Sequence, residues 1–330
     1  MIIAEIGLTH EGSLGSAHSY IDALAETGID AIKFQTHIAE AESSEKEKFR
    51  VPFSKQDRSR MDYWKRTSFK ENEWLGLKSH CEDMNINFLS TPSCLAAVDL
   101  LEKLNVSYYK VGSGDTSNHL LLNRIGETKK PILLSTGMST LDEIESSIKL
   151  LKHFKNPITL MQCTSKYPTN PEDWGLNLIQ KFEQYFNIPV GFSDHSGTIY
   201  PCLAAAALGA KAFEFHVVFD RNQFGPDVSS SITVNEVKTL TNGIRSITTS
   251  LKNPINKDDI SRYKSLRKLF GKSLSINKNK KSGDKIYISD LESKKPLGQG
   301  IPAKDFKTLI GKKLNKNLKK WSFIKGEDID

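Results

Sequence analysis

The chain has 330 residues, and its 38% hydrophobic and 26% charged residues are typical of a folded protein and exclude a disordered one. No apolar run reaches the roughly 18 residues that a membrane span needs. The opening MIIAEIGLTHEG lacks the basic lead of a signal peptide, so we expect a cytoplasmic protein without a membrane anchor. The four cysteines form no C-x-x-C pair, and we expect them to be reduced thiols.

The charge is unevenly distributed along the chain. Residues 1–255 hold 26 Lys and Arg against 30 Asp and Glu, a net −4, and residues 256–330 hold 20 against 9, a net +11, which together give the total of +7. The basic segment has few aromatic residues and no nucleic-acid-binding motif, so we expect no nucleic-acid partner. A solvated lysine surface, or attraction to an anionic substrate or to the acidic first part, accounts for the excess instead.

Eight short apolar runs recur over the first 250 residues, each followed by a polar cluster and a helical stretch. Such near-continuous apolar runs are typical of parallel strands buried on both faces. Ser68 with Glu71, and Thr140 with Glu143, form predicted capping boxes at the start of two helices. The alternation predicts a (β/α)8 TIM barrel, and the missing G-x-G-x-x-G loop disfavours a doubly wound sheet. The strands are predicted at residues 2–7, 30–35, 86–91, 108–114, 131–136, 158–164, 189–195 and 211–217.

Two segments do not fit this repeat. The connection over residues 36–67 is long and polar, and we expect it to cover an active site. After about residue 251 the sequence changes to short strand-like pieces at 272–277 and 284–289. We therefore expect a barrel domain over 1–255, a linker over 256–265 and a small β-rich domain over 266–330. So small a domain buries little surface alone and is expected to dock on something larger.

Polar residues follow nearly every predicted strand, at the end where barrel enzymes carry their chemistry. Burying Lys33 and Lys110 is costly unless they meet an anion, and with the neighbouring hydroxyls they indicate a ligand with phosphate and carboxylate groups. His195 and His216 end neighbouring strands near acids, which fits a divalent metal, although structural histidines remain an alternative. A lysine that forms a Schiff base, as in barrel aldolases, also stays open.

The motifs around these positions resemble those of the sialic acid (nonulosonic acid) synthases. The likeness runs in order along the barrel, and the C-terminal KKPLGQGI and LIGKKL…IKGEDI are similar to the small antifreeze-like (SAF) domain of that family. The barrel motifs are IIAEIGLTHEGSL, AIKFQTH, FLSTP, YYKVGSGD, PILLSTGMST, QCTSKYPT, GFSDHSG, FEFHVVFDR and FGPDVSSS.

The resemblance implies a transferase. Such enzymes condense phosphoenolpyruvate with free N-acetylmannosamine, or with a related sugar such as a 2,4-diacetamido-trideoxy hexose, and with water. They release phosphate and form a nine-carbon keto acid used in surface polysaccharides. The resemblance also implies a divalent metal cofactor, Mn²⁺ or Mg²⁺ with Co²⁺ as an alternative. It implies a homodimer in which the SAF domain of one subunit closes over the partner's barrel.

Matched position by position, the resemblance also implies roles for single residues. His195 and His216 fall on the metal ligands. The catalytic positions are Glu5, Lys33, Lys110 and Asp115, with Glu5 handling a proton or anchoring a hydroxyl and Asp115 lying near the metal. The phosphoenolpyruvate positions are Lys33, Thr91, Lys110, Ser113, Ser135, Ser165 and Ser193. The sugar positions are Glu5, Gln35, Tyr167 and Asp227.

The chain departs from the family pattern at several positions. Asp115 and Ser165 stand where Glu and Asn are usual, and Lys295, in KPLGQG, stands where the SAF domain usually presents an arginine. Lysine cannot make the planar bidentate contact of arginine, so the identity of the amino sugar stays open. Two alternatives remain, a related phosphoenolpyruvate-dependent synthase that acts on a sugar phosphate and a non-catalytic carbohydrate-binding protein.

Overall fold

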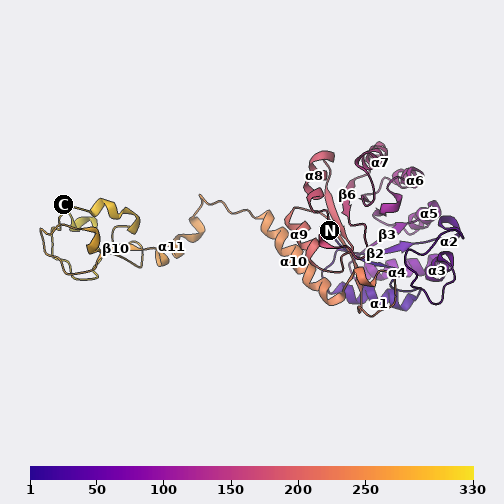
Figure 1. The fold of residues 1–330 in the computed structure, drawn as a ribbon, viewed down its shortest axis with the longest axis horizontal. Coiled ribbons are helices and arrows are strands. Elements are labelled where there is room, and N and C mark those ends of the chain that lie inside the picture. The colour runs from indigo at the N-terminus through magenta and orange to yellow at the C-terminus, as the bar shows by residue number, and fades with distance from the viewer. The chain divides into compact units, whose positions relative to one another are not determined.

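A computed structural model describes all 330 residues, which divide into two compact units, Met1–Asn253 and Pro254–Asp330. In Figure 1 the first unit runs from indigo to orange and the second from orange to yellow. The division lies close to the domain boundary expected at residue 255. None of the helices is both long and apolar enough to cross a membrane.

The first unit is a closed barrel of eight parallel strands that follow one another in chain order, with β1 pairing back onto β8. This confirms the predicted (β/α)8 TIM barrel. A ninth strand of three residues, β9, was not predicted and pairs with β8. The strands are β1 (Ile2–Gly7), β2 (Ala31–Thr36), β3 (Asn87–Pro92), β4 (Tyr109–Val111), β5 (Ile132–Ser135), β6 (Ile158–Cys163), β7 (Val190–Asp194), β8 (Phe213–Val218) and β9 (Ser231–Thr233).

Helices surround the strands (Figure 1). The predicted capping box of Thr140 and Glu143 is confirmed, because each accepts a hydrogen bond from the other's backbone N–H. The box predicted for Ser68 is wrong. The Ser68 hydroxyl donates to the carbonyls of His37 and Trp64, while Glu73 accepts from the Lys70 N–H at the helix start. The barrel's helices are α1 (Leu14–Ala25), α2 (Ala39–Glu42), α3 (Arg60–Thr67), α4 (Glu71–Asp83), α5 (Leu95–Lys103), α6 (His119–Glu127), α7 (Leu141–His153), α8 (Asn177–Phe186), α9 (Tyr200–Ala207) and α10 (Val234–Lys252).

The two-residue period of the strands stacks a polar layer on an apolar one inside the barrel. The apolar layer is Ile3, Ala31, Leu89, Leu133, Met161 and Ala212. The residues two positions further along the same strands are Glu5, Lys33, Thr91, Ser135, Cys163 and Glu214, and all six line one cavity. The barrel interior is therefore filled by the apolar layer, and the polar layer next to it, toward the carboxyl ends of the strands, borders a cavity that can hold a ligand.

The long connection after β2 carries α2 and α3 and the segment 43–59 between them, which we call the covering segment. Its aromatic residues pack with Tyr63 and Trp64 of α3 in a small apolar cluster. Arg66 of α3 links the covering segment to the loop after β1, since its guanidinium donates to the carboxylates of Asp57 and Glu11, each at 2.8 Å.

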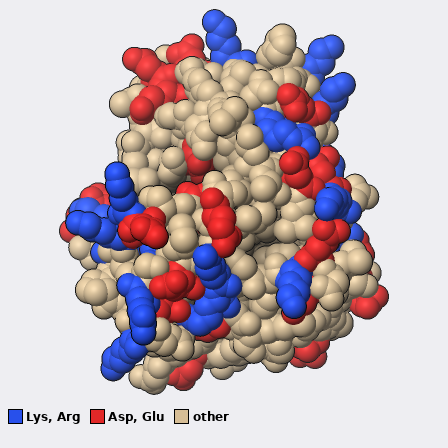
Figure 2. Space-filling view, turned by 90° about the vertical axis from the view of Figure 1, so that its right-hand side faces the viewer, with Lys and Arg blue, Asp and Glu red and all other residues tan.

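On the face of the molecule in Figure 2, basic and acidic side chains lie interspersed, with no continuous field of one sign.

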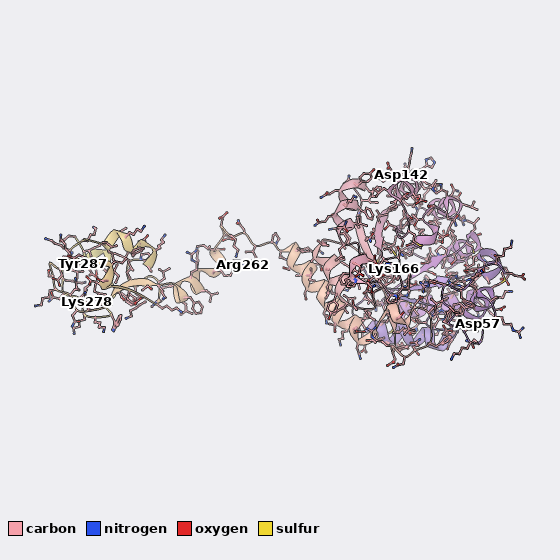
Figure 3. All side chains as sticks on the ribbon, in the orientation of Figure 1. Asp57, Asp142, Lys166, Arg262, Lys278 and Tyr287 are labelled. Carbon is pink, nitrogen blue, oxygen red and sulfur yellow. The ribbon has the colours of Figure 1, made fainter.

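The second unit has its own small core and little regular structure. It contains α11 (Lys264–Phe270) and a two-stranded antiparallel sheet of β10 (Ser273–Ile276) and β11 (Leu291–Lys294). Figure 3 labels Lys278 and Tyr287 within it. The core comprises Leu274, Ile276, Ile286, Leu309, Leu314, Leu318 and Ile324.

One of the two strands predicted in this unit is misplaced. Residues 284–289 make only an isolated bridge between Lys285 and Lys313, and the strand that pairs with β10 begins at Leu291. The cause is Asp290, whose buried carboxylate accepts the backbone N–H of Tyr287 at 3.0 Å and turns the chain there. Of the two isoleucines of this stretch, Ile286 packs in the core and Ile288 is exposed, and neither is part of a ladder.

Candidate active site

A cavity of about 190 Å³ opens at the carboxyl ends of the barrel strands. Most of the predicted site residues line it, and they come from all eight strands or from the connections after them. From the predicted set these are Glu5, Lys33, Gln35, Thr91, Lys110, Ser113, Ser135, Tyr167, Ser193, His195 and His216.

Two buried lysines face two buried carboxylates in this cavity. Lys33 Nζ lies 2.8 Å from Glu5 Oε2 and 3.7 Å from Glu214 Oε1. Lys110 Nζ lies 3.2 Å from the same Glu214 oxygen and donates to Ser135 Oγ at 2.8 Å. All four charged groups are at most 5% exposed. Both ammonium groups are thus engaged by carboxylates, yet the cavity beside them leaves room for a small ligand.

Lys33 and Glu214 are held in their charged forms by their neighbours. Burial alone would lower the pKa of Lys33, but the carboxylates of Glu214 and Glu5 raise it above its usual value. Burial alone would raise the pKa of Glu214, but Lys110 and Lys33 together lower it below its usual value. A second oxygen of Glu214 is buried without a hydrogen-bond partner, so this carboxylate retains capacity to accept a ligand hydroxyl or water.

His195 and His216 lie together at the ends of β7 and β8, with ring centroids 5.1 Å apart. Burial, and then the neighbouring ring of His216, lower the pKa of His195 far below its usual range, so the ring is neutral. Its Nδ1 lies 2.8 Å from the Thr164 carbonyl, and its Nε2 lies 2.7 Å from the Tyr167 hydroxyl. The ring therefore donates through Nδ1 and keeps a lone pair on Nε2, which accepts from Tyr167.

These imidazoles fit a divalent metal as a partial ligand set. A carbonyl that fixes Nδ1–H is the usual outer contact of a metal-binding histidine, and Nδ1 of His216 is buried without a partner. No group of three or more His, Cys, Asp and Glu residues is arranged to hold a metal ion. The chain thus offers two nitrogen donors, and the other positions of a metal would have to come from substrate or water.

Two serines, Ser113 in the cavity and Ser165 just outside its lining, border Gly137. The hydroxyl of Ser113 is buried and has no partner. A Cβ on Gly137 would lie 2.6 Å from Ser113 Oγ and 2.9 Å from Ser165 Oγ, so both hydroxyls border space that the missing side chain leaves free. Close backbone approach next to unpartnered hydroxyl donors is the kind of cradle that binds an oxyanion.

A second cavity of about 190 Å³ adjoins the first, and Gln35, Tyr167 and His216 line both. Arg50 of the covering segment lies over it. The guanidinium carbon of Arg50 is 4.1 Å from the centre of the Tyr167 ring, and Nη2 is 2.8 Å from Asp227 Oδ1. The long connection thus lies over the site, with Tyr167 and Asp227 on one wall.

Two predicted residues lie elsewhere. Asp115 lines a separate cavity of about 540 Å³ together with Glu42, and its carboxylate accepts from Asn118 at 2.9 Å. It does not line the cavity of the histidines, because the turn after β4 directs Ser113 inward and Asp115 outward. Lys295 belongs to the second unit, where its ammonium lies 5.0 Å from the Phe270 ring centre.

Two functional candidates received no role from the sequence. Glu214 stands two residues before His216 and was visible as a strand-end acid, but its place between two lysines depends on the register of β7, β8 and β1. Arg50 stands in an irregular segment, and no periodicity or motif connects it with Tyr167 or Asp227.

A sequence profile of the NeuB family matches residues 20–256. The chain belongs to the NeuB family. Among relatives of this NeuB chain, the N,N'-diacetyllegionaminic acid synthase of Campylobacter jejuni is 34% identical over 331 residues, covering 98% of each chain. The human N-acetylneuraminate-9-phosphate synthase is 31% identical over 332 residues, covering 100% of this chain and 92% of the relative.

A solved structure agrees with this membership. The crystal structure of the N-acetylneuraminic acid (sialic acid) synthetase from Leptospira borgpetersenii serovar Hardjo-bovis, in complex with citrate, is 30% identical with a TM-score of 0.71. The match covers 80% of the NeuB chain and 89% of that chain. The family inferred from the barrel motifs is therefore confirmed, while the SAF character of the second unit stays a prediction.

Proposed function

We propose that this protein is a nonulosonic acid synthase that condenses phosphoenolpyruvate with a free N-acylated amino sugar and water, releasing phosphate. The observation that supports it most directly is the cavity in which two charged lysines lie beside unpartnered hydroxyl and imidazole donors. Such a site suits a small, densely anionic substrate next to a neutral, hydroxyl-rich one.

The phosphate of phosphoenolpyruvate is assigned to the cradle of Ser113, Ser165 and Gly137. Lys110 is next to it through Ser135. The carboxylate is assigned to Lys33 and Thr91, whose side chains already contact each other at 3.0 Å. Both ammonium groups would offset the growing charge of the leaving phosphate in a site with little water.

In the reaction, carbon 3 of phosphoenolpyruvate attacks the aldehyde carbon of the open-chain sugar, which forms the new C–C bond. Water adds to carbon 2, and the tetrahedral product loses phosphate by C–O cleavage. Glu5 accepts the proton of that water, since its carboxylate lies in the cavity and is held by Lys33 and Gln35. Tyr167 and Asp227 bind hydroxyl groups of the sugar, each within the second cavity.

We further propose a divalent ion, Mn²⁺ or Mg²⁺ with Co²⁺ as an alternative, held by His195 and His216. It would supply Lewis acidity at the aldehyde oxygen. Because Tyr167 donates to His195 Nε2 in this structure, metal binding would replace that hydrogen bond. A homodimer with the second unit over the partner's barrel, in which Lys295 contacts the sugar, belongs to the same proposal.

The charges of the second cavity favour a free sugar over a sugar phosphate. Arg50 is paired with Asp227 at 2.8 Å, and Arg60 faces Glu47 at 3.5 Å. Each of these arginines already faces a carboxylate, while Tyr63, Trp64 and Phe53 offer apolar surface for an N-acyl group. The human relative is named for a 9-phosphate, so the alternative of a phosphorylated acceptor has to be tested directly.

The test is phosphate release that requires both substrates. Phosphoenolpyruvate, Mn²⁺ and a panel of N-acylated mannosamine and 2,4-diacetamido sugars are expected to give release, which EDTA stops. Paired reactions with each sugar and its phosphate compare the two acceptors. His195→Ala is expected to abolish turnover, whereas a carbohydrate-binding protein would lose only affinity. Absence of release from every sugar would count decisively against the proposal.

A further inference from the structure

His37 belongs to the long connection after β2 and lies near the cavity without lining it. It follows β2, and its ring stacks on Trp64 of α3 with centroids 3.9 Å apart and planes 15° apart. The backbone carbonyl of His37 accepts from Ser68 at 3.0 Å. Stacking on one ring face leaves the in-plane nitrogens as the groups through which His37 acts.

Both ring nitrogens of His37 face acceptors. Nε2 lies 3.2 Å from Gln35 Oε1, and Nδ1 lies 2.6 Å from Glu42 Oε1. The amide nitrogen of Gln35 is committed to Glu5 Oε1 at 2.8 Å, so the oxygen of that amide must face His37. An amide oxygen only accepts, so Nε2 of His37 carries the hydrogen and donates it to Gln35 Oε1.

The result is a continuous chain of hydrogen bonds, Glu42–His37–Gln35–Glu5, that ends at a carboxylate paired with Lys33. Its outer end is also well defined, since the side chains of His37 and Glu42 are 9% and 7% exposed. The remaining oxygen of Glu42 is buried without a partner, so the His37 ring is the only group that hydrogen-bonds this carboxylate.

We propose that His37 is a positioning residue: by fixing which end of the Gln35 amide faces Glu5, it holds the Glu5 carboxylate in place against Lys33. If the ring lost its Nε2–H, the amide of Gln35 would turn over and present its oxygen to Glu5. Two oxygens would then face each other, and Glu5 would move or lose its charge. This inference rests on the proposed function, in which Glu5 handles the proton of the added water.

The experiment compares His37→Phe, Glu42→Gln and the double variant His37→Phe/Gln35→Ala with the full-length enzyme. Phenylalanine keeps the stacking on Trp64 and removes both ring nitrogens. By analogy with outer contacts that orient metal ligands, we expect kcat of His37→Phe to fall about 10- to 100-fold. The KM for phosphoenolpyruvate should change by a smaller factor than kcat, because Lys110 and the serine cradle, to which the phosphate is assigned, are untouched. Glu42→Gln, which keeps an acceptor but removes its charge, should fall in the same direction by a smaller factor.

The double variant decides between positioning and simple structural support. If His37 acts only through Gln35, then Gln35→Ala and His37→Phe/Gln35→Ala have the same kcat, and the two effects are not additive. Ser93→Ala is the matched control, because its hydroxyl lies 3.1 Å from the same Nδ1 and has no contact with Gln35; its kcat should stay within about twofold. Full additivity in the double variant, or an unchanged kcat in a folded His37→Phe, overturns the inference. Failure of the wild-type enzyme to release phosphate would instead overturn the proposed function.

Discussion

Glu214 is the residue on which the charge balance of the site depends. One of its oxygens contacts Lys110, Lys33 and Ser193, at 3.2, 3.7 and 3.2 Å. Two ammonium groups this deeply buried need a counter-charge in the absence of substrate. An anionic substrate would compete for the same ammonium groups, so Glu214 sets how strongly the empty site attracts one.

Glu214→Gln is therefore expected to lower the free energy of unfolding by about 3–5 kcal/mol, because it leaves the buried ammonium group of Lys110 without a carboxylate. Added inorganic phosphate should raise the Tm of this variant more than that of the wild type, since an anion restores the lost charge. Thermal melting with and without phosphate measures both. The control is Asp173→Asn, which breaks an exposed pair with Lys166 and should leave the Tm nearly unchanged, with or without phosphate. If Glu214→Gln were as stable as the wild type and phosphate did not raise its Tm further, this account of the site would be refuted.

His10 predicts a pH dependence of stability. Burial, with the nearby His37 and Arg66, lowers its pKa to about 3, whereas in the unfolded chain a histidine binds its proton near pH 6.5. As the pH falls from 6.5 toward 3, only the unfolded chain takes up this proton, so folding loses about 1.4 kcal/mol per pH unit. Between pH 7 and pH 5, His10→Gln should therefore gain about 2 kcal/mol relative to the wild type in denaturant titrations. The control is His119→Gln, at an exposed position, which should not gain free energy of unfolding in this way. An equal gain in that variant would mean that groups other than His10 cause the pH dependence of stability.

At the scale of elements, two helical glycines make opposite predictions. A Cβ on Gly126 of α6 would lie 2.4 Å from the Phe154 ring, whereas one on Gly76 of α4 meets nothing within 4 Å. Gly126→Ala forces the Phe154 ring away from the helix and should cost about 1–3 kcal/mol. Gly76→Ala only restricts the unfolded chain and should stabilise by about 0.5–1 kcal/mol. Denaturant titration of both variants checks the signs, and a destabilising Gly76→Ala would contradict the open surroundings of that residue.

The elements also show what the sequence can predict. The eight barrel strands are predictable from apolar runs, because strands that are buried on both faces consist mostly of apolar residues. β9 has only three residues and gives no run, and residues 284–289 have the composition of a strand but are turned by Asp290. The cap at Ser68 failed because its hydroxyl donates to the carbonyls of Trp64, at the end of the preceding helix, and of His37, a long-range contact that the local sequence does not reveal.

In the candidate site, too, the sequence predicts the residues on regular strands and not those in irregular segments. Lys33, Lys110 and His216 lie on regular strands, so their shared direction is readable from alternation. Asp115 lies in a turn, where the local backbone conformation determines which cavity a side chain lines, and alternation therefore does not predict its direction. Arg50 contacts Tyr167 from a segment that has no periodic pattern.

At the scale of the whole molecule, the two units differ in charge and in core. The first holds the large core and a net charge of −4, and the second holds a core of seven buried residues and a net +11. Two buried aspartates organise the second unit: Asp290 pairs with Lys278 and Lys280, and Asp328 with Lys316. Most of its lysines are left over from such pairs and stay available for an acidic surface.

Deleting residues 266–330 is expected to abolish phosphate release while leaving the barrel folded. The barrel should survive because its core, its closed sheet and both lysine–carboxylate pairs lie within Met1–Asn253. Activity should be lost because the proposed dimer closes each barrel with the second unit of the partner. Circular dichroism and thermal melting test folding, light scattering tests the dimer, and coupled phosphate detection tests turnover. Rising salt should weaken the full-length dimer if its +11 unit binds the acidic barrel, since screening acts on exposed charges. A truncated monomer that keeps full activity would show that the barrel alone is the complete enzyme.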